Sequence, residues 1–161
     1  MLIKSTRGFT LIELMIVVTI LGILSMITFP VYQGMVIESQ IKEAMAIADQ
    51  LKPTIEAFYK EKKAFPKNNK EAGLPEPEKI LGNYVKSIEV TDGAMHILLG
   101  NKVHASALNR WLTIRPIVVK DSPESPISWV CGHGTVPEGM IFQGDNKTDI
   151  DFTLLPVRCR I

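Results

Sequence analysis

A single apolar run near the N-terminus is the feature that most constrains how this chain can fold. It extends from Phe9 to Phe29. As an α-helix this run of about 21 residues would measure about 31 Å, close to the hydrocarbon thickness of a bilayer. Lys4 and Arg7 precede it, which places the N-terminal side in the cytoplasm and sends the remainder outward. The run therefore predicts a transmembrane helix over residues 9–29.

The segment before the run is short and basic. Residues 1–8 contain no apolar stretch followed by a small-residue cleavage site, so they do not form an ordinary secretory signal.

Glu13 is the only charged residue inside the run. A charged side chain within the membrane is costly and usually has a partner or a function. Near the interface, however, a glutamate can extend its carboxylate to water and need no partner. Both interpretations are open from the residues alone.

The sequence from Gly8 to Val18, Gly-Phe-Thr-Leu-Ile-Glu-Leu-Met-Ile-Val-Val, resembles the processing motif of type IV pilins and their secretion-system relatives. The resemblance implies that residues 1–8 are a leader, and that a prepilin peptidase cleaves between Gly8 and Phe9 and methylates the new amine of Phe9. It also implies that Glu13 pairs with this amine on a neighbouring subunit. Such a buried charge pair would set the axial register of assembly.

A second, amphipathic helical pattern follows the apolar run. Its apolar positions recur at spacings of three and four, which predicts one buried stripe: Ile37, Ile41, Ala44, Ala48, Leu51, Ile55 and Phe58. We expect one long helix over residues 9–63, curved and locally weakened by Pro30 and Pro53. The stripe is expected to cover a sheet, although a self-associating coiled coil is the alternative.

Residues 64–161 are predicted to form a globular head. Three prolines between positions 64 and 82 indicate a long surface connection, which the resemblance identifies as the αβ-loop. Alternating residues on both sides of Asp92-Gly93 predict a hairpin, with further strands over 111–119 and 127–131. Pro116 suggests an edge position or a bulge. One long helix followed by consecutive strands predicts an α+β domain with an antiparallel sheet.

Cys131 and Cys159 both lie near the C-terminus, beyond the predicted anchor. An even cysteine number in that setting predicts one disulfide. A zinc site formed by Cys131, His133 and Cys159 is the rival, but it supplies three ligands at an unfamiliar spacing. Ser125 to Gly132, together with the late second cysteine, also resembles the major type IVa pilins, in which a disulfide bounds an exposed C-terminal loop.

Residue patterns that support catalysis are missing from the sequence. His96, His104 and His133 stand apart from any nucleophile, phosphate-loop or metalloprotease motif. The alternation of Asp145, Asp149 and Asp151 lacks the glycine and final glutamate of a calcium loop, and Asn146-Lys-Thr148 matches a glycosylation acceptor. The net charge of +1 gives no general attraction to nucleic acid. We predict no enzyme, no cofactor and no metal.

The predicted function is that of a structural subunit of a type IV pilus. The helix over 9–29 would anchor the precursor in the bacterial inner membrane and then form the core of a homo-oligomeric helical filament on the cell surface. The predicted partners are the prepilin peptidase and the pilus assembly machinery. The resemblance implies adhesion, twitching motility or DNA uptake, so DNA or a host surface could be bound. A secretion pseudopilin or minor pilin, and an unprocessed single-span membrane sensor, are the alternatives.

Overall fold

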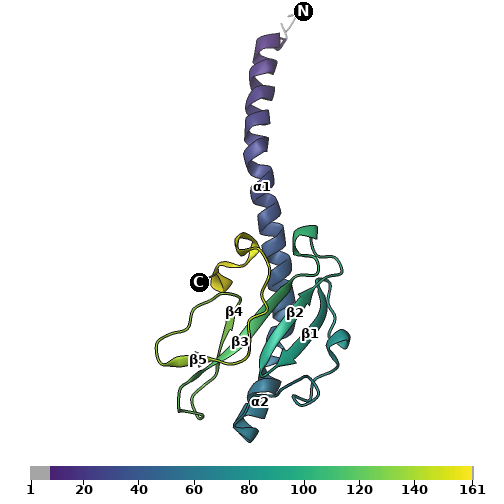
Figure 1. The fold of residues 1–161 in the computed structure, drawn as a ribbon. Coiled ribbons are helices and arrows are strands. Elements are labelled where there is room, and N and C mark those ends of the chain that lie inside the picture. The colour runs from purple at the N-terminus through teal and green to yellow at the C-terminus, as the bar shows by residue number, and fades with distance from the viewer. Residues whose placement is uncertain (1–7, 161) are drawn as a thin grey trace, which may run out of the picture. The chain divides into compact units, whose positions relative to one another are not determined.

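The structure, a computed structural model, describes residues 8–160, and in residues 28–31 it describes the backbone but not the side chains. The described chain divides into two compact units, the first ending at Val36 and the second beginning at Ile37. Figure 1 shows a long helix α1, a short helix α2 and a sheet. The predicted α+β fold is confirmed, because the second unit packs helical residues on an antiparallel sheet.

Helix α1 spans Leu11–Asp49 and α2 spans Lys52–Lys62. The predicted 9–63 helix is therefore divided at Gln50 and Leu51, whose N–H groups bond three residues back, to Ile47 and Ala48. The cause is Pro53: it has no N–H to donate to the carbonyl of Asp49, so the α-helical ladder cannot continue. The backbone of α1 runs on through position 30, where a proline also stands.

The sheet contains β1 (Val85–Thr91), β2 (Ala94–Leu99), β3 (Trp111–Val119), β4 (Ser128–Cys131) and β5 (Met140–Phe142). Its order is β1-β2-β3-β4, β5 also pairs with β3, and every pairing is antiparallel. Asp92 and Gly93 have φ values of 49° and 82°. Two consecutive positive φ values are typical of the type I′ hairpin turn that this dipeptide predicts.

Pro116 lies inside β3 rather than at the edge of the sheet. Strands β2 and β5 lie on the same side of β3, opposite β4. Pairing with β2 ends at Ile114, and pairing with β5 begins at Ile117. The missing N–H of Pro116 thus falls in the gap between two partner strands, while its carbonyl accepts a bond from Gln143 N (3.0 Å). The three-residue β5 was not among the predicted strands.

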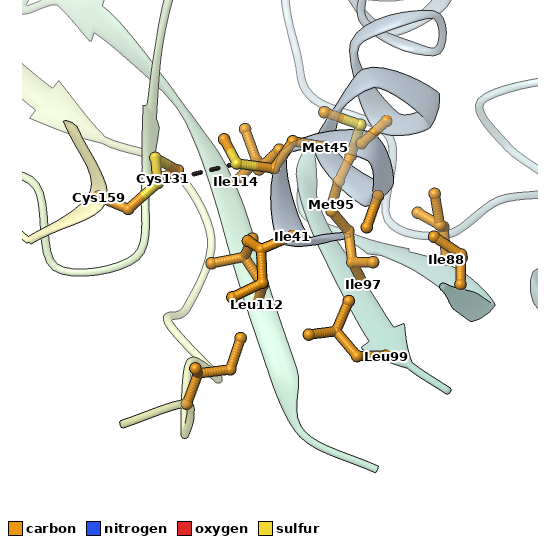
Figure 2. Packing of buried hydrophobic residues seen from close by; sticks show 14 of the residues in the cluster. Ile41, Met45, Ile88, Met95, Ile97, Leu99, Leu112, Ile114, Cys131 and Cys159 are labelled. Carbon is orange, nitrogen blue, oxygen red and sulfur yellow. Dashed lines mark hydrogen bonds between the residues drawn. A yellow bond between two sulfur atoms is a disulfide. The ribbon is translucent and has the colours of Figure 1, made fainter. Parts of the chain in front are cut away.

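The core of the second unit lies between the helical stripe and the inner face of the sheet. Figure 2 shows Ile41 and Met45 of α1 facing Met95, Ile97 and Leu112. The predicted stripe is buried from Ile37 to Ala48 and again at Ile55, whereas Leu51 and Phe58 are only partly buried. Because the helix is divided at Leu51, its second segment turns Tyr59 inward in place of Phe58. The coiled-coil alternative is wrong, since this stripe already has a partner.

Candidate functional site

Two regions carry the residues that the sequence analysis singled out: the start of α1 and the disulfide near the C-terminus. Residues 1–7 of the predicted leader, with Lys4 and Arg7, lie outside the described residues. Gly8 and Phe9 are described, and both are exposed. A Cβ atom placed on Gly8 would meet no other atom within 4 Å. The fold of this chain therefore gives no reason for a glycine at position 8.

Glu13 and Thr10 form a capping box at the start of α1. The Oε2 atom of Glu13 accepts bonds from the Thr10 backbone N–H (2.9 Å) and from the Thr10 hydroxyl (2.7 Å). The Glu13 N–H in turn donates to the Thr10 Oγ1 atom (3.3 Å). This reciprocal arrangement satisfies backbone N–H groups that the first turn of a helix leaves open. Sequence reasoning missed this role, although the Thr-x-x-Glu pattern could have indicated it.

The remainder of the first unit is apolar and uncovered. Every large apolar side chain from Leu11 to Ile27 is exposed, from 46% at Val17 to 81% at Met26. The hydroxyls of Thr19 and Ser25 donate to the carbonyls four residues earlier, both at 2.7 Å, so these polar groups are satisfied within the helix. Within the described residues, the helix beginning at Leu11 is the one long and apolar enough to cross a membrane.

Cys131 and Cys159 are joined by a disulfide that spans 28 positions, with a Cα–Cα distance of 4.7 Å. Both residues are buried, and the Cys159 sulfur lies 3.9 Å from the Met45 sulfur (Figure 2). The bond fastens the C-terminal turn to β4 and brings both against α1. The zinc alternative is wrong, because sulfurs that are bonded to each other are not thiolate ligands.

The three histidines do not come together. His96 is fully buried in β2, and its Nδ1 lies 2.9 Å from the Thr113 hydroxyl. His104 accepts a bond from the Ser106 N–H (3.2 Å) and thereby caps a short turn. His133 is exposed, and its backbone N–H donates to the Cys159 carbonyl. Burial, and to a smaller extent the positive charge of Lys147, lower the pKa of His96 to about 4.

The acidic residues of the candidate calcium pattern have separate structural roles. Asp149 accepts a bond from the Trp111 N–H. Asp151 caps the following turn, because its Oδ1 accepts bonds from the Thr153 N–H (2.8 Å) and the Thr153 hydroxyl (2.6 Å). Lys147 pairs with Glu89 at 3.0 Å. Residues 145–151 thus fasten the C-terminal segment to the sheet, and within residues 8–160 no group of acidic, histidine or cysteine side chains is arranged to hold a metal ion.

Asn69 is a further buried polar residue that sequence reasoning did not find. It lies in the connection between α2 and β1, is 4% exposed, and bonds to the backbone of β1. An asparagine in a turn-rich segment predicts a local turn, so the sequence held no signal for this longer-range contact.

Comparison with known proteins gives two family matches. Residues 38–160 match the pilins, which are bacterial filament proteins. Residues 3–29 match the prokaryotic N-terminal methylation motif.

Individual relatives match over most of their length. The chain is 30% identical to a type IV major pilin protein, PilE1, of Neisseria gonorrhoeae, over 96% of this chain and 93% of the relative. It is 30% identical to a fimbrial protein of Neisseria meningitidis serogroup B, over 96% and 94%. It is 32% identical to the fimbrial protein EcpC of Eikenella corrodens, over 81% and 85%.

Proposed function

This chain belongs to the pilin family of bacterial filament subunits, and we propose that it is a major subunit of a type IV pilus that polymerises through its N-terminal helix. The family is structural, so the chain is a filament subunit and not an enzyme. The relatives named as major pilins and fimbrial proteins support the major-subunit assignment.

The observation that carries the proposal is the uncovered apolar surface of α1 from Leu11 to Ile27. Apolar surface of this extent must be removed from water, and two environments can do that. A bilayer covers it in the precursor, and the same helices of neighbouring subunits cover it in the filament. The helix thus serves first as anchor and then as filament core, and no second hydrophobic surface is required.

We propose that processing occurs between Gly8 and Phe9, with residues 1–8 as the leader and Phe9 as the methylated residue. The match to the N-terminal methylation motif over residues 3–29 supports this position. So does the open space around Gly8, since a glycine without a role in the fold is consistent with one required by a peptidase. Cleavage there leaves the Thr10–Glu13 cap intact, because Thr10 keeps its amide bond to Phe9.

Glu13 has capacity for a second partner after it has capped the helix. Both bonds from Thr10 reach Oε2, and no donor within residues 8–160 reaches Oε1. We propose that this oxygen accepts the methylated amine of Phe9 from a neighbouring subunit. In the apolar core of a filament, each of the two charges would otherwise be buried alone, which is strongly unfavourable. The pairing therefore favours one axial register of neighbouring subunits over others.

The localisation follows the same sequence of steps. The precursor lies in the bacterial inner membrane with Lys4 and Arg7 on the cytoplasmic side, where the prepilin peptidase acts. The assembly machinery then extracts the processed chain into an extracellular helical filament of identical subunits. The Cys131–Cys159 disulfide is consistent with a head exposed to an oxidising compartment.

The filament would serve adhesion, twitching motility or DNA uptake, and its outer surface would meet a host surface or DNA. The alternatives are a secretion pseudopilin or minor pilin, which share the N-terminal motif. The C-terminal disulfide and the names of the relatives favour the pilus subunit.

Mass spectrometry of filaments sheared from the cell surface tests the proposal. We expect this chain to be the main component, with an N-terminus at methylated Phe9. A mature chain that retains Met1 would favour an unprocessed membrane protein. A correctly processed chain that is present only in trace amounts would favour a minor subunit or pseudopilin.

A further inference from the structure

Strand β1 forms an outer edge of the sheet, and its free side requires explanation. Its neighbour is β2, and within residues 8–160 no strand pairs with its other side. Ile88 and Val90, which flank Glu89, direct backbone groups to the free side, where the connection before β1 reaches them. An open edge strand is a template for pairing with another chain.

The side chain of Asn69 occupies this edge. Its amide NH₂ donates to the Ile88 carbonyl (2.9 Å), and its Oδ1 accepts from the Val90 N–H (2.7 Å). The two atoms therefore occupy the backbone groups on both sides of Glu89 that an added strand would have to bond. The second amide hydrogen donates to the Pro75 carbonyl (3.0 Å), so the side chain has a partner for each of its polar groups here.

Further features protect the two ends of the same strand. At one end the β1–β2 register shifts between Val85 and Ser87, and the exposed Lys86 lies at this irregularity. At the other end the Gly93 N–H bonds to the Pro66 carbonyl (2.9 Å) of the same connection that carries Asn69. A bulge and a lysine are known means of discouraging edge pairing, which leaves the central groups of Ile88 and Val90 to Asn69.

We propose that Asn69 closes the edge of β1 against β1 of a second copy of this chain. The β1 edges of two copies can pair in antiparallel orientation around a two-fold axis. A copy whose β1 edge is open could therefore bind another such copy. The inference goes beyond the proposed function, because it concerns what keeps heads from pairing laterally. It applies to single chains in solution as well as to subunits in a filament.

The test compares Asn69→Ala with Asn68→Ala in the full chain, solubilised in detergent. Asn68 is a suitable control because it is exposed in the same connection and caps the Glu71 N–H locally. The probe is a fluorescent peptide with the β1 sequence, Val-Lys-Ser-Ile-Glu-Val-Thr. We expect Asn69→Ala to bind it and to associate as protein concentration rises, whereas the wild-type chain and Asn68→Ala do neither.

Hydrogen exchange supplies an independent measurement on the folded chain. The Val90 amide of the wild-type chain should exchange as slowly as interior sheet amides, although Val90 lies on an edge strand. In dilute Asn69→Ala its exchange should accelerate about tenfold or more, as expected when one buried hydrogen bond is lost.

Three outcomes would overturn the proposal. The first is fast exchange of the Val90 amide in the wild-type chain. This measurement needs no variant, so it tests the proposal even if Asn69→Ala fails to fold. The second is unchanged protection of Val90 in a folded Asn69→Ala chain. The third is a deprotected Val90 in a variant that neither binds the peptide nor associates. None of these measurements requires filaments, so they fail or succeed independently of the pilus assignment.

Discussion

Glu13 and Thr10 are joined by three hydrogen bonds, two of which converge on one oxygen of the glutamate. The only charge in the apolar run thus already has a partner in its own chain. A capped glutamate is held with its second oxygen available, in one orientation relative to the helix. The capping role and the proposed assembly role are therefore compatible, and they can be separated by substitution.

Gly8→Leu is expected to leave the leader attached and to trap the chain in the inner membrane. A Cβ at position 8 meets nothing in the folded chain, so the variant should fold and insert normally and fail only at the peptidase. Immunoblots of the membrane and surface fractions measure the ratio of precursor to mature chain. Gly34→Ala is the control, since position 34 is equally open and alanine favours a helix. Abundant surface filaments from Gly8→Leu would contradict the cleavage site.

Loss of the disulfide is expected to destabilise the head. For the Cys131–Cys159 separation of 28 residues, the loop-closure estimate gives about 3.5 kcal/mol. Cys131→Ser should lower the midpoint of urea unfolding correspondingly, and it should reduce filament yield while leaving leader cleavage unchanged. The double variant Cys131→Ser/Cys159→Ser controls for reactions of a free thiol. Unchanged unfolding in both variants would show that the bond does not stabilise the head.

His96 should make the head sensitive to acid. The Lys147 N–H donates to the Thr113 hydroxyl oxygen (2.9 Å), and the same hydroxyl shares a hydrogen bond of 2.9 Å with His96 Nδ1, in which the tautomer of the ring sets the donor. Within residues 8–160, Nε2 is buried without a hydrogen-bond partner. Lys147 opposes a second proton, while Glu89 and Asp145 favour one, and burial determines the net effect.

The pKa of His96 is about 4 in the folded chain, against 6.5 for an exposed histidine. Between these values the unfolded chain binds a proton that the folded chain does not. Stability is therefore complete above pH 6.5 and falls by about 3 kcal/mol as the pH drops to 4. Urea unfolding across this range measures the slope. His96→Gln should flatten the curve, and the exposed His133→Gln should not. Equal slopes for both variants would mean that another group is responsible.

The parts of the fold that sequence predicted correctly are those governed by local periodicity. The stripe from Ile37 to Ala48 and the Asp92-Gly93 hairpin depend on spacing and turn geometry, which a short window of sequence contains. The predictions at Leu51 and Phe58 were less accurate, because the missing N–H of Pro53 ended one helix and began another with a different inward face.

Residues whose roles depend on distant contacts could not be predicted in this way. Asn69 is defined by Ile88 and Val90, about twenty positions away. The lowered pKa of His96 depends on its burial in the sheet and on the charge of Lys147, from the C-terminal segment. The strand β5 is short, and its pairing to β3 is possible because β2 ends beside Pro116. In each case the deciding partner comes from another element, which no local pattern specifies.

The two roles of Glu13 can be separated with Glu13→Gln and Thr10→Ala. Glutamine keeps an amide oxygen that accepts the Thr10 bonds, but it carries no charge. Thr10→Ala removes the hydroxyl of the cap and keeps the carboxylate. If Glu13 serves only as a cap, Glu13→Gln should assemble normally and Thr10→Ala should be impaired. If it pairs with the amine of Phe9, Glu13→Gln should insert and be cleaved yet yield few filaments, while Thr10→Ala loses only part of its yield.

We expect the second pattern, because a charge on Phe9 without a counterion would remain in the apolar filament core of Glu13→Gln. Glu13→Ala lacks both the cap and the charge, so its yield should be no higher than that of Glu13→Gln. Immunoblots of inner-membrane and sheared surface fractions give the yields, and mass spectrometry of the membrane fraction verifies cleavage at Phe9. Coexpression with the wild-type chain adds a sensitive comparison, since mixed filaments should exclude Glu13→Gln more strongly than Thr10→Ala. Surface filaments of Glu13→Gln at wild-type abundance would rule out the charge pair and leave the cap as the role of Glu13.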